Sequence, residues 1–115
     1  MLEGTPQRMS AETRQLLLEL YDAAVAAAHP RTCLAPHLPP APKTGRLIVL
    51  SAGKAAIAMA AVAEAHYRAA GTLDRIVGVA TAPHGYAAAL DSFKPERLEI
   101  LEGRHPTPDE TSLVA

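Results

Sequence analysis

A lysine directly follows a turn of small residues in the stretch RLIVLSAGKAAIAMA, residues 46–60. The residues before the turn are typical of a buried strand and those after it of a helix, so the turn lies where the strand ends. A helix N-terminus at such a point exposes unpaired backbone N–H groups and carries positive potential, a combination that binds anions. Lys54 adds a full positive charge at the same place.

The turn Ser51-Ala52-Gly53 has side chains small enough for a ligand to approach its backbone, and its glycine tolerates conformations that other residues avoid. Because the helix dipole disfavours lysine in a first turn, Lys54 favours a role in binding an anion such as phosphate. A lysine that only faces solvent explains the same residue, and the residues alone do not separate these two interpretations.

Two common phosphate-binding motifs are excluded. A Walker A loop requires glycine where Ile48 stands and a Ser or Thr where Ala55 stands. The dinucleotide fingerprint G-x-G-x-x-G does not occur in the sequence either.

A histidine follows the second predicted strand in the stretch APHGY, residues 82–86. Ligands of open α/β sheets bind at the carboxyl ends of the strands, so His84 and Gly85 are candidates for contacting a substrate. His84 could donate a hydrogen bond to an anion or exchange a proton near neutral pH. The alternative is a turn histidine in solvent.

The third candidate stretch is HPTPDE, residues 105–110. Asp109 and Glu110 open a predicted last helix, where carboxylates suit the helix dipole and need no further explanation. His105 has no such explanation. We expect His105 and Asp109 to shape a loop near a domain junction rather than to perform chemistry.

The sequence predicts neither a metal centre nor a nucleophile–base pair. Its five histidines are scattered without metal-binding spacing, and Ser51 lacks the G-x-S-x-G frame of a nucleophile elbow. His66, which shares a predicted helix with Glu64, is most simply a helix-surface residue.

The elements that would position these residues begin with a helix over residues 11–28, where apolar residues recur at helical spacing. Ser10 is a typical N-cap, and His29-Pro30 ends the helix. The proline-rich stretch 30–44 excludes a regular helix, so we expect an extended surface connection; a ligand for a proline-binding domain is the less favoured alternative.

A short aliphatic strand over residues 47–50 should be buried on both faces, as in a parallel sheet. An alanine-rich helix over 55–70 follows, with Gly71 as its stop, and then a strand over 75–81. This order predicts a right-handed βαβ crossover.

A loop over residues 82–91 precedes a third strand at 97–101, and a further helix opens at 111–115. The fold class is therefore α/β, with a Rossmann-like parallel sheet flanked by helices. Because the last residue falls inside an element, we expect the incomplete N-terminal portion of a larger two-domain protein. Residues 1–9 are expected to form a flexible terminus before the domain part at 10–115.

Composition narrows the class of protein further. A net charge of −1 with 3% aromatic residues gives no basic surface for nucleic acid. No apolar run reaches the roughly 18 residues of a membrane span. The single cysteine, Cys33, cannot form an internal disulfide and suits a cytoplasmic location. The sequence leaves oligomeric state open, a homodimer included.

Two stretches in this order resemble one family. LIVLSAGKAAIAMA resembles the strand–Gly-Lys–helix signature of class II glycerate 2-kinases, often named hydroxypyruvate reductases. LEILEGRHPTPDETS resembles the His-Pro-x-Pro-Asp segment of the same family, and the resemblance covers roughly residues 12–115.

The resemblance implies an enzyme that transfers phosphoryl from ATP to the 2-hydroxyl of D-glycerate, with Mg²⁺, giving 2-phosphoglycerate. It implies that Lys54 stabilises the transferring phosphate, with Ser51, Ala52, Gly53, His84 and Gly85 at the substrate. The family's glycine-rich nucleotide loop and a later arginine have no counterpart in residues 1–115, so this chain alone should be inactive.

There are departures from the family's pattern. Ala82 and Pro83 stand where members usually carry Thr and a basic residue, and Ser51 replaces a commoner glycine. Two other hypotheses stay open. One is an oxidoreductase acting on hydroxypyruvate, against which the missing dinucleotide fingerprint counts. The other is a catalytically inactive truncated module.

Overall fold

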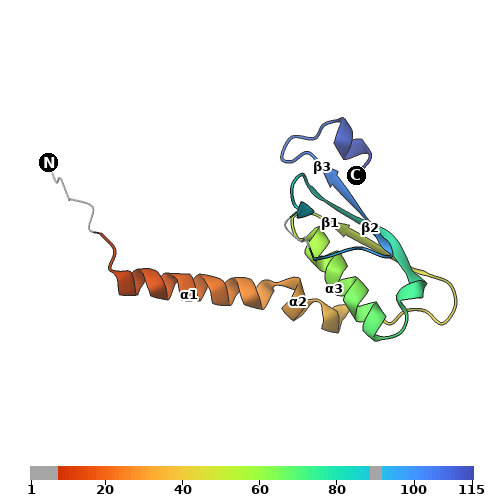
Figure 1. Cartoon of the computed structure of the whole chain (residues 1–115), viewed down its shortest axis with the longest axis horizontal. Helices are drawn as coiled ribbons and strands as arrows, with labels where there is room; N and C mark the ends of the chain where they lie inside the picture. The colour runs from red at the N-terminus through yellow and green to blue at the C-terminus, as the bar shows by residue number, and fades with distance from the viewer. Residues whose placement is uncertain (1–7, 89–91) are drawn as a thin grey trace.

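The computed structural model describes residues 8–88 and 92–115, and the first seven residues of the expected flexible terminus lie outside these ranges. A long helical arm leads into a small α/β unit (Figure 1). In chain order the elements are α1 (Ala11–Ala28), α2 (Pro30–Cys33), η1 (Ala35–His37), β1 (Leu47–Ala52), α3 (Ala56–Ala69), η2 (Leu73–Arg75), β2 (Ile76–Pro83), β3 (Leu98–Gly103) and η4 (Glu110–Leu113).

The three strands form one parallel sheet in the order β1-β2-β3. Helix α3 connects β1 to β2 and lies along one face of the sheet. The core is formed where small side chains of α3, such as Ala60, meet Ile76 of β2 and Leu98 of β3. The predicted α/β class and the parallel crossover unit are confirmed.

Gly78 lies at the centre of β2, opposite Val49 of β1. A Cβ atom at position 78 would stand 1.8 Å from the carbonyl oxygen of Val49. Only glycine therefore allows the two strands to approach this closely.

The opposite face of the sheet is open over β1. Ile48 is 68% exposed and Leu50 is 76% exposed, whereas Leu47 and Val49 turn toward the core. The expectation that this strand is buried on both faces is therefore wrong, because no helix within the described ranges covers this side of β1.

Helix α1 has the predicted bounds. The side chain of Ser10 accepts a hydrogen bond from the backbone N–H of Thr13, as an N-cap does, and His29 in an extended conformation ends the helix. The helix projects away from the sheet (Figure 1). Across the described ranges, no helix has both the length and the apolar character that a bilayer crossing requires.

The proline-rich stretch is more structured than expected. It begins with the short helix α2 and the 3₁₀ turn η1, so the prediction of a purely extended connection is wrong. Pro30 occupies the first turn of α2, where a missing N–H is harmless, and the ring of His29 caps that turn by accepting from Arg31 N. After η1, the hydroxyl of Tyr67 in α3 donates a hydrogen bond to the carbonyl of Pro39 at 2.8 Å, which holds this part of the stretch against α3.

A buried carboxylate fixes the start of β3. Glu64 of α3 is 0% exposed, and its oxygens accept hydrogen bonds from the backbone N–H groups of Glu96, Arg97 and Leu98 at 2.8–3.1 Å. Glu64 is therefore a buried residue of α3. His66, two positions further along the helix, is half-buried.

All three strands run further toward their carboxyl ends than the sequence predicts. β1 continues through Ser51 and Ala52, β2 through Ala82 and Pro83, and β3 through Gly103. Pro83 is tolerated because it is the last residue of its strand. The predicted last helix is a short 3₁₀ turn, η4.

Candidate functional site

The carboxyl ends of the three strands meet around one pocket, which we call the carboxyl-edge pocket. Its volume is about 250 Å³. It is lined by Gly53 after β1, by Thr81, Ala82 and Pro83 of β2, and by Gly103, Arg104, His105, Pro106, Pro108, Ser112 and Ala115 of β3 and the segment after it. Parallel strand topology thus brings together three of the stretches that the sequence singled out.

Gly53 forms the sharp turn between β1 and α3. Its φ of 103° lies in the region that favours glycine, and its N–H donates to the carbonyl of Thr81 at 2.9 Å. This bond extends the contact between β1 and β2 beyond the last strand pair. The backbone N–H of Gly53 is therefore engaged within the protein, and Gly53 reaches the pocket as a lining residue.

Lys54 is exposed and lies in the turn two residues before α3, so it is not in the first helical turn where the sequence placed it. The N-cap position, Ala55, has no side-chain hydrogen bond to the helix, so α3 begins without a side-chain cap. The N–H of Ala56 donates to the carbonyl of Gly53 at 3.1 Å, and the other N–H groups of the first turn leave the helix end electropositive. Lys54 lies beside this helix end and directly follows Gly53, which lines the pocket, but Lys54 is not itself among the described lining residues.

Ser51 and Ala52 belong to β1 rather than to the turn. Ser51 is buried, and its hydroxyl donates to the carbonyl of Ala56 at 3.0 Å. This bond ties the end of the strand to the first turn of α3. The arrangement gives Ser51 a structural explanation, and a contact of its hydroxyl with phosphate stays a prediction. Ala52 points to the opposite, open face and is exposed.

His84 and Gly85 follow β2, but the described residues that line the pocket do not include them. The backbone N–H of His84 donates to Gly103, and its Nε2 lies 3.2 Å from the hydroxyl of Thr111. Since Thr111 donates its own hydroxyl proton to Asp109, its oxygen accepts from His84 Nε2–H. His84 therefore fastens the C-terminal segment to the strand ends.

Asp109 caps the turn η4. One carboxylate oxygen accepts from both the hydroxyl and the backbone N–H of Thr111, and the side chain of Ser112 accepts from the backbone N–H of Asp109. The Thr111 hydroxyl, above all, lowers the pKa of Asp109 below its ordinary value, and the nearby His84 contributes. Asp109 therefore stabilises this turn, and its place near a domain junction stays a prediction.

Arg104 is the residue that sequence reasoning missed. It directly follows β3, is exposed, and lines the pocket beside His105. No acidic side chain is found among the described lining residues, so the guanidinium makes the pocket attractive to an anion. The signal was present in the sequence, because Arg104 stands at the end of a strand as Lys54 does.

The described residues hold no group of three or more His, Cys, Asp or Glu side chains that could bind a metal ion. Arg104 gives the pocket a cation that suits a small anion.

Comparison with known proteins gives the family. Residues 16–115 match the family described as "Domain of unknown function (DUF4147)". The chain belongs to this family. It is also 40% identical over 102 residues to a curated protein of Agrobacterium vitis named "Putative hydroxypyruvate reductase". No solved structure matches the chain significantly.

The match covers 89% of this chain and 21% of the Agrobacterium protein, so the chain spans about a fifth of that relative's length. Both findings agree with the resemblance to class II glycerate 2-kinases, whose members often carry the name hydroxypyruvate reductase. The expected family is thereby confirmed.

Proposed function

We propose that this chain forms the N-terminal part of an ATP-dependent D-glycerate 2-kinase, with Lys54 stabilising the phosphoryl group during transfer. The observation that carries the proposal is the position of Lys54. It follows the positive-φ Gly53 at the uncapped start of α3, next to a pocket where three strands end.

Phosphoryl transfer suits such a site because little covalent chemistry is required of the protein. The transferring group carries negative charge on its equatorial oxygens, and cations held in place lower the barrier. Lys54 would supply one such cation at the helix end. Arg104 would hold the carboxylate of a small hydroxy acid, and a pocket of about 250 Å³ accommodates an acid of this size.

The two expected cofactors fit the described residues differently. Lys54 and the electropositive start of α3 fit a phosphate group of ATP. Mg²⁺ prefers carboxylate oxygens, and no cluster of suitable ligands occurs within the described ranges. The described residues therefore fit a phosphate and do not fit Mg²⁺.

The alternative reaction is reduction of hydroxypyruvate, which the name of the Agrobacterium relative favours. Against it, the sequence lacks the dinucleotide fingerprint. A Rossmann enzyme also places an acidic residue near the end of the second strand to bind a ribose hydroxyl, whereas β2 ends in Thr81-Ala82-Pro83. Kinase chemistry therefore remains the better proposal.

The chain alone is expected to be inactive, since it spans about a fifth of the relative it matches. A cytoplasmic location is proposed as well, because the single cysteine of this chain, Cys33, is free and exposed and suits a reducing compartment.

The test is a coupled assay on the complete protein that contains this chain. With ATP and D-glycerate it should release 2-phosphoglycerate, identified against authentic 2- and 3-phosphoglycerate. With NADH and hydroxypyruvate it should not oxidise NADH. Oxidation of NADH without phosphorylation would overturn the proposal in favour of the reductase.

A further inference from the structure

Helix α1, the arm, is an amphipathic helix that contacts α2 but buries none of its residues within the described ranges. None of its 18 residues is buried, and large apolar side chains remain exposed along it, including Leu16 at 55%, Leu20 at 58% and Tyr21 at 66%. An isolated helix of this length is marginal in water and normally gains stability from burying its apolar face. The arm therefore presents a surface that needs to be covered.

One flank of this apolar face is acidic. Glu12 and Glu19 are separated by two helical turns and so lie on the same side of the arm, next to Leu16. Gln15 donates to Glu19 at 2.9 Å and orients its carboxylate. Neither glutamate has an ion-pair partner within residues 8–88 and 92–115.

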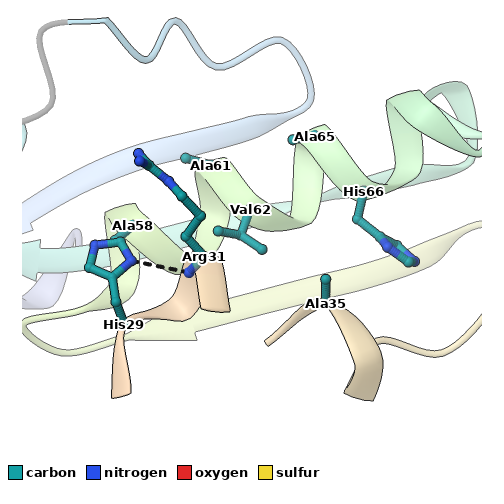
Figure 2. A pocket seen from close by; sticks show the side chains of 8 residues that line it. All are labelled: His29, Arg31, Ala35, Ala58, Ala61, Val62, Ala65 and His66. Carbon is teal, nitrogen blue, oxygen red and sulfur yellow. Dashed lines mark hydrogen bonds between the residues drawn. The ribbon is translucent and has the colours of Figure 1, made fainter. Parts of the chain in front are cut away.

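A groove of complementary character lies between α2, η1 and α3. We call it the alanine groove; its volume is about 440 Å³ (Figure 2). Small side chains form one wall along α3, namely Ala58, Ala61, Val62 and Ala65, and Ala35 faces them from η1. Small residues allow the backbone of a second helix to come close.

The rim of the alanine groove carries only basic groups, which are His29, Arg31 and His66. Arg31 has no ion-pair partner in the described part of the chain. His29 accepts from Arg31 N through Nδ1, so its Nε2 carries the proton and can donate. The groove and the arm are thus complementary in both charge and apolar character.

We propose that the alanine groove binds the arm of a second copy of this chain, and that two copies exchange arms around a twofold axis. The N-terminal half of each arm would lie in the partner's groove, with Glu12 and Glu19 facing Arg31 and His29. The other half would pair antiparallel with its counterpart. Twofold symmetry repeats the contact, so each copy buries both of its open surfaces.

A second copy fits better than the arm of the same chain. Only His29 separates α1 from α2, whereas an antiparallel helical hairpin needs a loop of about 2–5 residues. The arm therefore cannot fold back over α3 of its own chain without unwinding. This inference does not depend on the proposed function.

The test is a charge exchange, measured by sedimentation velocity on the complete protein that contains this chain. The unaltered protein should be a dimer. Glu19→Arg and Arg31→Glu should each raise the dimer Kd by more than about tenfold, because each puts like charges in contact. A mixture of the two variants should dimerise again, since both contacts then join opposite charges. Lys94→Glu, an exposed lysine outside both surfaces, serves as the matched control.

Several outcomes would overturn the proposal. One is a monomeric unaltered protein. Another is a pair of variants that remain monomeric when mixed although circular dichroism shows native helix content. A third is a dimer that resists both charge reversals and dissociates with Leu50→Glu, which would assign the contact to the open face of the sheet.

Discussion

The two edges of the sheet differ in how their polar groups are satisfied. At the amino edge, where β2 and β3 begin, Glu64 is fully buried and accepts backbone N–H groups of three successive residues. Arg97 donates to the carbonyls of Ile76 and Asp74 at 3.0 Å. At the carboxyl edge, Lys54 and Arg104 are exposed and have no ion-pair partner in the described ranges.

This difference separates stability from binding. Polar groups that are buried and fully hydrogen-bonded hold the strands in place and cannot contact a ligand without breaking the fold. Charged groups at the ends of parallel strands contribute little to stability and remain available to an anion. The amino edge therefore fixes the sheet, and the carboxyl edge displays the candidate chemistry.

The largest expected effect is at the amino edge. Glu64→Ala removes the acceptor of three backbone N–H groups and should destabilise the fold by about 3 kcal/mol or more. Urea unfolding followed by circular dichroism measures this loss. Glu99→Ala, at an exposed glutamate of β3, should change stability by less than about 0.5 kcal/mol. Equal effects of the two substitutions would contradict a structural role for Glu64.

At the carboxyl edge, a substitution should affect activity more than stability. In the complete protein, Lys54→Ala should lower kcat by about 100-fold or more. Its free energy of unfolding should change by less than about 0.5 kcal/mol, because the side chain is exposed. Kinetics with ATP and D-glycerate test this, with Lys94→Ala as the control. Parallel losses of stability and activity would instead make Lys54 a structural residue.

Ser51 sharpens the comparison because it lies at the carboxyl edge but is buried. Ser51→Ala removes the hydrogen bond to the carbonyl of Ala56 and should cost about 1 kcal/mol of stability. The KM for the hydroxy acid should stay unchanged. A large rise in this KM with unchanged stability would instead support the predicted contact of Ser51 with the substrate.

The smallest effect concerns Asp109, whose pKa is lowered chiefly by the Thr111 hydroxyl. The capped turn is favoured at pH values above the ordinary carboxyl pKa and loses this contribution as pH falls through the folded value. Thr111→Val should raise the pKa of Asp109 toward its ordinary value, as followed by carboxyl ¹³C NMR titration. An unchanged pKa would show that the hydroxyl does not stabilise the carboxylate.

Local signals account for the parts of the fold that the sequence predicted. The arm begins at Ser10 and ends at His29 because a cap and the following Pro30 act through adjacent backbone atoms. Gly71 ends helix α3 in the same way, because its positive φ of 70° cannot continue a right-handed helix. The aliphatic runs predicted the strands, although they did not show that Ile48 and Leu50 would remain exposed.

The candidate site was predictable in location but not in detail. Placing Lys54 and His105 at one edge of the sheet follows from parallel topology alone. The sequence did not show that His84 would bond to Thr111, or that Arg104 would join the pocket, because both depend on the path of the segment after β3.

The sequence by itself therefore determined the helices α1 and α3, the three strands, the parallel crossover and the cation after the end of β1, since these depend on neighbouring residues. Only the tertiary structure decided which polar side chains are buried. The neighbours of Lys54 place it in a turn after a strand, whereas nothing in the immediate neighbours of Glu64 shows that its carboxylate would be buried inside a helix-and-sheet contact. Glu64 is enclosed because residues 96–98, more than 30 positions along the chain, bring three backbone N–H donors to its carboxylate.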